Sequence, residues 1–525
     1  MIFVLDFGSQ YSHLITRRIR ELGVYAELVA PNFPLEKLKN ADGIILSGGP
    51  QNLSDSNALR VDKKIYSLGI PILGICYGMQ LTAYELGGRV KAGKKREYGP
   101  TEIKITKADP LFRGLKPRQM TWMSHGDQVV KMPKGYVKIA ESLNCPISAM
   151  ANVAKKIYGL QFHPEVMHTT NGTKILENFL KITGAQKTWF MKDFVKHEIA
   201  KIKQQAGSDK VICALSGGVD SAVAAEIVRR AVGKNLTCIF VDTGLMREGE
   251  AKQIRKVFRN SPNPSYPKRG TPPLKLRGGR EGLLNLKVMK AQKEFLRKLK
   301  GVTDPEKKRK IIGELFIRIF EREARKIKNA RWLVQGTLYT DAVTSGVSIG
   351  GKHTAVIKSH HNVGGLPKKM GLKLIEPLRE LYKDEVRKIG KILGLPKSIV
   401  YRQPFPGPGL AVRIIGKITE ERLDLLRRAE SIVSEEIEKN GVKIQQYFAV
   451  LPIIRSVGVQ GDARTYGHPI IVRAITTPDL MTAHWAKLPY SLLEKISNRI
   501  TNEIPGINRV VYDITSKPPA TVEWE

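Results

Sequence analysis

The chain has 525 residues, 42% of them hydrophobic, which is enough for about three domains with buried cores. Its apolar runs stay below the roughly 18 residues of a membrane span, and its first residues contain no basic signal-peptide region. We therefore expect a cytoplasmic protein without a membrane partner. Four scattered cysteines, none in a Cys-x-x-Cys pair, predict reduced thiols: Cys76, Cys145, Cys213 and Cys238.

The formal net charge of +38 comes from 87 lysine and arginine residues against 49 acidic ones. Such an excess attracts polyanions, so binding of nucleic acid is one explanation. Anionic small substrates and adaptation to the intracellular environment are the others. Because the basic residues are spread along the chain and are not gathered in one run, we expect no nucleic-acid partner.

The first 185 residues predict an α/β domain, since strand-like runs alternate with amphipathic stretches. The runs expected as strands are 3–6, 43–46, 70–75 and 157–162, and the amphipathic stretches include 12–22 and 80–86. Functional loops in such a fold follow the carboxyl ends of parallel strands. Three motifs occupy these positions.

Two of these motifs together form a candidate nucleophile and base. Residues 74–78, Gly-Ile-Cys-Tyr-Gly, are typical of a sharp strand-to-helix turn that exposes Cys76 at a helix N-terminus, where a thiolate is stabilised. His163 and Glu165 follow a strand, in which side chains two residues apart point the same way. Glu165 can therefore orient His163 as the base for Cys76.

The third motif is a turn at 47–50, Ser-Gly-Gly-Pro, whose amides together with that of Tyr77 can face a developing oxyanion. Each motif alone is typical of an ordinary turn or a buried cysteine. Their combination and order, with the segments 6–11 and 122–127, resemble the class I glutamine amidotransferases, in which a Cys-His-Glu triad hydrolyses glutamine through a thioester. The resemblance implies the catalytic triad Cys76, His163 and Glu165 and these oxyanion-hole or glutamine-binding residues: Gly48, Gly49, Tyr77, Gln80, Ser124, His125, Gly126 and Asp127.

Residues 214–221, Ala-Leu-Ser-Gly-Gly-Val-Asp-Ser, lie between an apolar run and a helix-like stretch. The amides of such a turn and the following helix N-terminus favour a phosphate, although the spacing and lysine of a Walker A loop are missing. An ordinary tight turn is the alternative, but Asp220 is well placed to hold Mg²⁺ beside phosphates. The segment resembles the pyrophosphate loop of the ATP pyrophosphatases, which implies ATP binding by Ser216, Gly217, Gly218, Val219, Asp220 and Ser221.

A second strand expected at 236–241 predicts a doubly wound parallel sheet with a nucleotide at the strand ends. Four segments then resemble the GMP synthetase family: 302–313, 335–339, 357–367 and 374–378. In that family the amidotransferase supplies ammonia, and ATP adenylates the O2 atom of xanthosine 5′-monophosphate (XMP) before ammonia displaces AMP. From the residues themselves, Lys358 can neutralise phosphoryl charge, and Asp341 can share Mg²⁺ with Asp220.

The chain also departs from that family's pattern. Residues 259–282 form a basic, Pro/Gly-rich insertion. Two interpretations of this insertion stay open, an irregular loop and an RNA-binding arm. Lys290 and Thr344 stand where the family has an aspartate and a glutamate. The loss of the second carboxylate puts one contact with a lid or a metal ion in doubt. His484 also replaces an aspartate.

From about residue 401 the pattern changes to α+β, with a helix expected at 419–439 and strands at 410–414, 447–452, 470–474 and 508–514. Residues 455–466 and 513–525 resemble the C-terminal domain of the GMP synthetases, which implies a homodimer through this domain and closure of the XMP site. Basic side chains suit a nucleotide phosphate, and a carboxylate suits the donor edge of a purine. The expected XMP-binding residues are Arg309, Arg473, Lys517, Thr521 and Glu523.

The predicted architecture is therefore two doubly wound, mainly parallel-sheet α/β domains at 1–185 and 186–400, followed by a smaller α+β domain at 401–525. The predicted activity is amination of XMP to GMP with ammonia from glutamine. Its substrates are glutamine, ATP and XMP, and its cofactor is Mg²⁺. Two alternatives stay open: an ATP pyrophosphatase that acts on tRNA, and a basic RNA-binding protein with an inactive enzyme fold.

Overall fold

The structure is a computed structural model that describes residues 1–259, 285–344, 371–442, 444–477 and 483–525. The chain divides into two compact units: one contains Met1–Phe194, and the other begins at Val195. Lys358 and most of the insertion predicted at 259–282 lie outside the described residues. Among the helices of the described ranges, none is long and apolar enough to cross a membrane.

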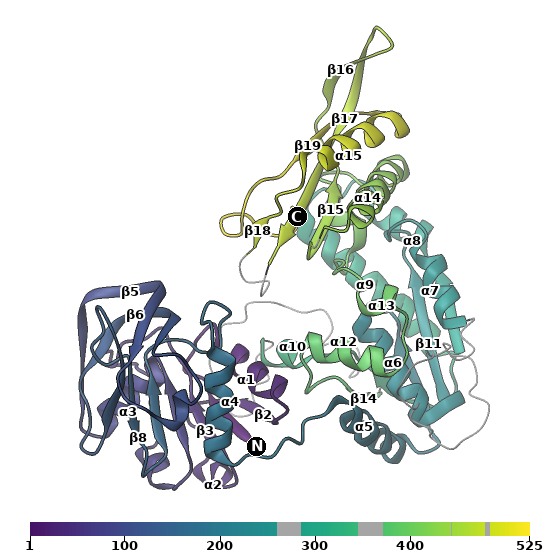
Figure 1. Ribbon diagram of the computed structural model, residues 1–525. Coiled ribbons are helices and arrows are strands. Elements are labelled where there is room, and N and C mark those ends of the chain that lie inside the picture. Colours follow the sequence, from purple (N-terminus) through teal and green to yellow (C-terminus); the bar gives the residue numbers. More distant parts are fainter. Residues whose placement is uncertain (260–284, 345–370, 443, 478–482) are drawn as a thin grey trace, which may run out of the picture. The chain divides into compact units, whose positions relative to one another are not determined.

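A nine-stranded sheet organises the first unit (Figure 1). In spatial order its first five strands are parallel, and the remaining four pair antiparallel. The strands, in spatial order, are β2 (Ala26–Val29), β1 (Ile2–Leu5), β3 (Gly43–Leu46), β4 (Ile72–Ile75), β9 (Ile157–Leu160), β8 (Ala149–Asn152), β7 (Val137–Ser142), β5 (Arg89–Ile105) and β6 (Arg118–Lys131). The parallel strands β1, β3, β4 and β9 are buried along their whole length, which explains their continuous apolar runs.

Helices cover both faces of this sheet. The helices are α1 (Ser12–Glu21), α2 (Leu35–Leu38), α3 (Tyr77–Glu85) and α4 (Gly172–Thr183). Since alternate strand residues point to opposite faces, Ile2 and Val4 of β1 pack in one hydrophobic cluster with α1 and α4. Phe3 and Leu5 point the other way and pack in a second cluster with α3. The predicted doubly wound α/β fold is confirmed here.

The second unit contains a parallel five-stranded sheet with the order β12-β11-β10-β13-β14. The chain runs outward from β10 to β12 on one side and then returns to the other side for β13 and β14. The strand order therefore reverses between β10 and β13, and folds of this kind bind ligands at such a point. The strands are β10 (Lys210–Ala214), β11 (Leu236–Asp242), β12 (Asn285–Lys290), β13 (Ala330–Val334) and β14 (Lys373–Ile375).

Most helices between residues 191 and 400 alternate with these strands, as the doubly wound prediction requires. They are α5 (Met191–Ala206), α6 (Val219–Val232), α7 (Glu250–Arg259), α8 (Gln292–Leu299), α9 (Pro305–Ala324), α10 (Tyr339–Thr344), α12 (Lys383–Ile392) and α13 (Lys397–Val400).

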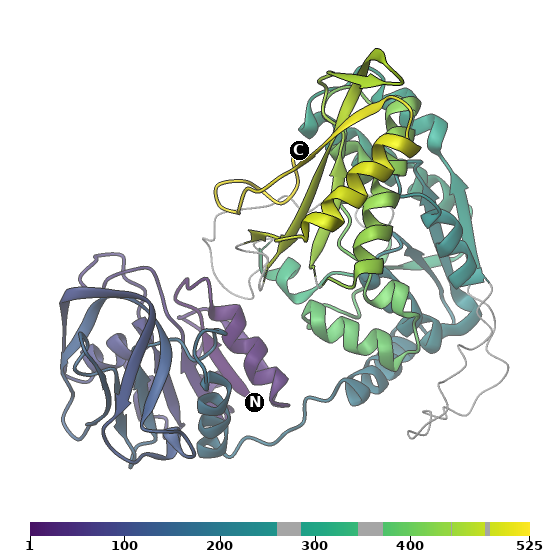
Figure 2. The ribbon, with the colours of Figure 1, turned by 45° about the horizontal axis from the view of Figure 1, so that its top comes forward.

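The C-terminal part of the second unit is α+β, as predicted. Strand β17 (Ala463–Thr476) is central, because it pairs antiparallel with β15, β16 and β18 and parallel with β19. Helices α14 (Glu420–Asn440) and α15 (Tyr490–Glu503) lie side by side and pack against this sheet (Figure 2). The other strands are β15 (Gln446–Val450), β16 (Ser456–Gln460), β18 (His484–Trp485) and β19 (Ile507–Tyr512).

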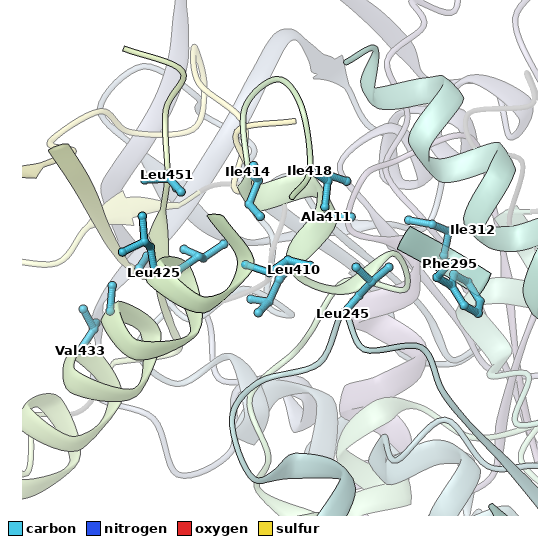
Figure 3. Close-up of a cluster of buried hydrophobic side chains, with 14 of the residues drawn as sticks. Leu245, Phe295, Ile312, Leu410, Ala411, Ile414, Ile418, Leu425, Val433 and Leu451 are labelled. Atoms are coloured by element: carbon cyan, nitrogen blue, oxygen red, sulfur yellow. The ribbon is translucent and has the colours of Figure 1, made fainter. Parts of the chain in front are cut away.

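The strand expected at 410–414 is wrong: Gly409–Arg413 forms a short 3₁₀ helix, η4. All of its residues are buried, so the apolar run has no exposed face, and a short run of this kind does not distinguish a strand from another buried segment. Leu410 packs with Leu245, from the loop after β11, and with Leu425 of α14 (Figure 3). Through this cluster the parallel sheet and the C-terminal sheet share one hydrophobic core.

Candidate active sites

The three motifs predicted in the first unit lie at one edge of its sheet. Strands β3, β4 and β9 are adjacent and parallel, so the loops at their carboxyl ends are neighbours. Cys76 and His163, from two of these loops, line one cavity of about 1070 Å³. These predicted pocket residues line the same cavity: Gly49, Tyr77, Gln80, Ser124, His125, Gly126 and Asp127.

Cys76 has an unusual backbone conformation, with φ 51° at the N-cap of α3. Such a conformation costs about 1–3 kcal/mol and persists mainly at active sites. Gly74 and Gly78 allow the turn: a Cβ atom on Gly78 would lie 2.2 Å from the Leu46 carbonyl oxygen, and one on Gly74 would lie 2.5 Å from that of Gly78. The turn therefore presents the sulfur at a helix N-terminus beyond the strand end.

His163 and Glu165 form a buried pair beside this sulfur. His163 Nδ1 lies 2.7 Å from Glu165 Oε1. Burial by itself lowers the pKa of His163, but the Glu165 carboxylate and a hydrogen bond with Cys76 outweigh it and raise the pKa to about 10. His163 can therefore hold the proton that it takes from Cys76 at neutral pH.

Glu165→Gln is expected to lower the pKa of His163, because it removes the charge that opposes the effect of burial. The folded-state pKa of about 10 lies above the ordinary histidine pKa of 6.5, so the contribution of His163 to the free energy of unfolding is complete below pH 6.5 and is lost as pH rises through 10. The stability difference between the wild type and Glu165→Gln is therefore largest below pH 6.5 and shrinks toward pH 10. Scanning calorimetry of the full chain across this range measures it.

The matched control for this experiment is Glu36→Gln, since the Glu36 side chain is 80% exposed on α2. Its effect on stability should be small at every pH. A stability difference for Glu165→Gln that stays constant from pH 6.5 to pH 10 would contradict the charge interaction between Glu165 and His163.

The glycine turn brings backbone directly against His163. A Cβ atom on Gly48 would lie 3.0 Å from His163 Cε1, and one on Gly49 would lie 2.7 Å from the Phe7 carbonyl oxygen. The Ser47 hydroxyl fixes the turn, because it accepts a hydrogen bond from the Phe7 amide at 3.0 Å and donates one to the Gly48 carbonyl at 2.8 Å. Glycine at these positions keeps the backbone close to His163 without a steric clash, as a turn that faces an oxyanion requires.

Besides lining the cavity, His125 belongs to a buried cluster with Glu97 and Cys145. Its Nδ1 lies 3.0 Å from the Asp127 carbonyl oxygen, and its Nε2 lies 3.2 Å from Glu97 Oε2. Ligand atoms of His125, Glu97 and Cys145 lie within 4.8 Å of one another, a donor set that can hold a metal such as Zn²⁺. Burial raises the pKa of the Cys145 thiol to about 12, which disfavours the thiolate that a metal needs. The observed hydrogen bonds fix the segment that carries Asp127.

In the second unit, the segment 216–221 comprises the tight turn after β10 and the first three residues of α6. Gly217 has φ 80°, and a Cβ atom there would lie 2.3 Å from Ile254 Cδ1. The hydroxyl groups of Ser216 and Ser221 lie 3.0 Å apart, and that of Ser221 accepts a hydrogen bond from the Ser216 amide at 3.2 Å. The two ends of the turn are thus tied together next to the N-terminus of α6, which favours an anion.

Asp220 lies where the strand order reverses. The loop after β13 approaches it closely, since a Cβ atom on Gly336 would lie 3.2 Å from the Asp220 carbonyl carbon. Asp220 Oδ2 pairs with Lys383, whereas Oδ1 is buried and has no hydrogen-bond partner among the described residues. An unpartnered carboxylate oxygen beside a phosphate turn suits Mg²⁺. Asp341 follows the same loop, and its Oδ2 accepts a hydrogen bond from the Leu338 amide at 3.1 Å.

Arg473, which was expected to bind XMP, is fully buried and holds the C-terminal tail instead. Its guanidinium donates to Asp513 Oδ2 at 2.6 Å, to the Thr521 carbonyl at 2.8 Å and to the Val522 carbonyl at 2.9 Å. The guanidinium of Arg473 is therefore engaged by the tail, which it fixes in place.

The tail also contacts α9. Lys308 is fully buried and donates to the Ile414 carbonyl at 2.7 Å and to Glu525 Oε2 at 2.5 Å. Burial lowers the pKa of Lys308, although Glu525 acts in the opposite direction. Arg309 donates to the Glu525 carbonyl. The predicted residue Arg309 is thus brought to the end of the tail that carries Glu523.

Comparison with known proteins identifies the family. Three family descriptions match successive parts of the chain: Glutamine amidotransferase class-I at 3–183, NAD synthase at 190–260 and GMP synthase C terminal domain at 435–524. A protein of Halothermothrix orenii called GMP synthase [glutamine-hydrolyzing] is 54% identical over 530 residues, which cover 100% of this chain and 99% of that protein. The chain belongs to the glutamine-hydrolysing GMP synthase family.

Relatives with the same name confirm the resemblance to GMP synthases over the full length. That of Carboxydothermus hydrogenoformans is 54% identical over 529 residues, and that of Clostridium novyi is 53% identical over 530 residues. Each match covers 100% of this chain and 99% of the relative.

In this GMP synthase family member, sequence reasoning missed three basic residues near the candidate sites. Lys383 of α12 pairs with Asp220. Arg402 donates to the Gly217 carbonyl, and the fully buried Arg413 donates two hydrogen bonds to Glu523, at 3.1 and 3.0 Å. No local motif marks these residues, because each reaches its site from an element distant in the sequence.

Proposed function

We propose that the protein makes GMP from XMP, ATP and glutamine and releases AMP, pyrophosphate and glutamate. The observation that carries this proposal is the presence, in one chain, of a buried Cys76–His163–Glu165 triad and a phosphate turn at a reversal of strand order. The triad supports acyl transfer, and the turn supports nucleotide binding. Relatives that match the entire chain carry the name of this reaction.

Cys76 is the nucleophile of the glutaminase half. His163 takes its proton, and the sulfur attacks the carboxamide carbon of glutamine while the amides of the turn 48–49 and of Tyr77 face the developing oxyanion. His163 then returns the proton to the departing nitrogen, so ammonia leaves and a thioester remains. Water hydrolyses the thioester to glutamate. The lining residues that we assign to glutamine binding are Gln80, Ser124, His125, Gly126 and Asp127.

The turn at 216–221 binds the pyrophosphate part of ATP in the synthetase half. Asp220 and Asp341 would hold a Mg²⁺ ion, which neutralises phosphate charge when bound. The O2 atom of XMP attacks the α-phosphorus, and pyrophosphate leaves into the turn, where Lys383 lies beside Asp220. Ammonia then attacks the adenylated carbon, and AMP leaves with the oxygen. Lys358 is proposed to neutralise the charge that develops on the transferred phosphoryl group.

XMP is proposed to bind at the C-terminal tail. Lys517 and Arg309 suit its phosphate, whereas Thr521 and Glu523 suit its base. The Glu523 side chain is held in place by Arg413, whose guanidinium donates to both of its carboxylate oxygens. We propose that Glu523, held in this way, accepts hydrogen bonds from the donor edge of the purine.

The proposed functional regions keep the boundaries 1–185, 186–400 and 401–525. A homodimer through the last region is supported by exposed apolar side chains there, since Ile453, Val459 and Tyr466 are 62%, 73% and 61% exposed and such surfaces commonly mark interfaces. Sedimentation equilibrium of the full chain tests the dimer. We place the enzyme in the cytoplasm, where ATP and reduced thiols are available; the four cysteines are free.

Product analysis tests the proposed reaction. The purified chain with XMP, ATP, Mg²⁺ and glutamine is expected to form GMP, AMP, pyrophosphate and glutamate in equal amounts. Pyrophosphate release that requires tRNA instead of XMP would favour an ATP pyrophosphatase acting on tRNA. Salt-dependent RNA binding without any turnover would favour an RNA-binding protein with an inactive fold.

A further inference from the structure

Gln161 has no part in the triad, but its side chain reaches the nucleophile. It follows the end of β9, and its backbone amide donates to the Ser148 carbonyl at 2.9 Å. The side chain is fully buried, and its Nε2 lies 3.7 Å from Cys76 Sγ. Gln161 and His163 follow β9 in a segment that bends at 161–162, and both approach Cys76, since a hydrogen bond also links His163 to Cys76.

The hydrogen-bond network decides which end of the Gln161 amide faces the sulfur. Gln80 Nε2 donates to the Asp127 carbonyl at 2.7 Å, so this atom is a nitrogen. The same Nε2 lies 3.4 Å from Gln161 Oε1. If the Gln161 amide were reversed, two amide nitrogens would face each other, and both can only donate. The NH₂ group of Gln161 therefore points at Cys76.

A hydrogen-bond donor beside the Cys76 sulfur affects the thiolate that forms when Cys76 loses its proton. Cys76 Sγ lies 3.6 Å from the Ser124 carbonyl oxygen, which accepts a hydrogen bond from the neutral thiol. In the thiolate the same oxygen faces a negative sulfur and repels it. The NH₂ group of Gln161 offsets this repulsion in a buried site, where a hydrogen bond to a charged acceptor is strong.

We propose that Gln161 is a positioning residue of the glutaminase reaction, which donates a hydrogen bond to the Cys76 sulfur and stabilises its thiolate form. This role rests on the proposed function of Cys76. It also connects the glutamine pocket to the nucleophile, because the Asp127 carbonyl fixes Gln80 and Gln80 fixes the amide of Gln161. Glutamine bound against Asp127 thus meets a sulfur that the same network holds.

Two variants test this role in the full chain. Gln161→Met keeps the length of the side chain and removes the donor, and Gln161→Glu keeps the shape and places acceptor oxygens beside the sulfur. The rate of Cys76 alkylation by iodoacetamide at neutral pH is expected to fall in the order wild type, Gln161→Met, Gln161→Glu. The pH of half-maximal alkylation should rise in both. Glutaminase kcat should fall about tenfold to a hundredfold with little change in KM.

The control is Gln119→Met, since Gln119 is also buried in the first unit but bonds to the Lys116 carbonyl and to Asn171, away from Cys76. A purely structural role predicts that the isosteric Gln161→Glu is the milder change and that the pH profile stays fixed; either result overturns the proposal. Cys76→Ala is assayed in parallel. If Cys76→Ala keeps glutaminase activity, the proposed function itself fails, whichever result the Gln161 variants give.

Discussion

Cys76→Ala is expected to lower GMP formation from glutamine by about a thousandfold or more, while GMP formation from added ammonium is retained. The substitution removes the sulfur that we propose as the nucleophile, which lies at the strained N-cap of α3. It leaves the turn at 216–221 in the other compact unit unchanged. The measurement is the rate of GMP formation with each nitrogen source in turn.

Cys145→Ser is the matched control, because Cys145 is a second buried cysteine of the first unit. It should retain most of the activity with either nitrogen source. If Cys76→Ala loses both activities in a folded protein, the division of labour between the two sites is wrong.

Asp220→Asn is expected to lower XMP-dependent pyrophosphate release about a hundredfold or more with either nitrogen source. The variant keeps the shape of the side chain but removes the charge of a buried oxygen that has no hydrogen-bond partner among the described residues. It also leaves the Lys383 ammonium without its carboxylate. The Mg²⁺ concentration needed for half-maximal release should rise as well.

The control for this charge change is Asp424→Asn, since Asp424 is exposed on α14 of the same unit. It should release pyrophosphate at nearly the wild-type rate. Wild-type release by Asp220→Asn at ordinary Mg²⁺ concentrations would contradict the role of this carboxylate in the nucleotide site.

The arrangement of the first site could be predicted from the sequence because local rules determine it. Gly74 and Gly78 flank Cys76 in the pattern of a strand-to-helix turn, and the structure shows why neither can carry a side chain. The predicted pairing of His163 with Glu165 is present at 2.7 Å, although the structure places Pro164 and Glu165 in a turn after β9 and not in the extended segment that the pattern predicted. Parallel neighbours β3, β4 and β9 then bring these loops to one edge.

Residues whose role depends on tertiary contacts could not be predicted in this way. The run 410–414 is apolar enough for a strand, but an apolar run alone does not distinguish a buried strand from the buried 3₁₀ helix that 409–413 form. Arg473 has the charge to bind a phosphate, but the fold commits its guanidinium to tail carbonyls. Lys383 and Gln161 reach Asp220 and Cys76 only after distant segments have packed.

The most direct test of the proposed reaction is pyrophosphate release from ATP with and without XMP. Adenylation of XMP at the turn 216–221 predicts that release requires XMP and proceeds with the wild type and with Cys76→Ala when ammonium is supplied. Release at the same rate without XMP would contradict it, because ATP would then be cleaved without the nucleotide that the reaction converts to GMP.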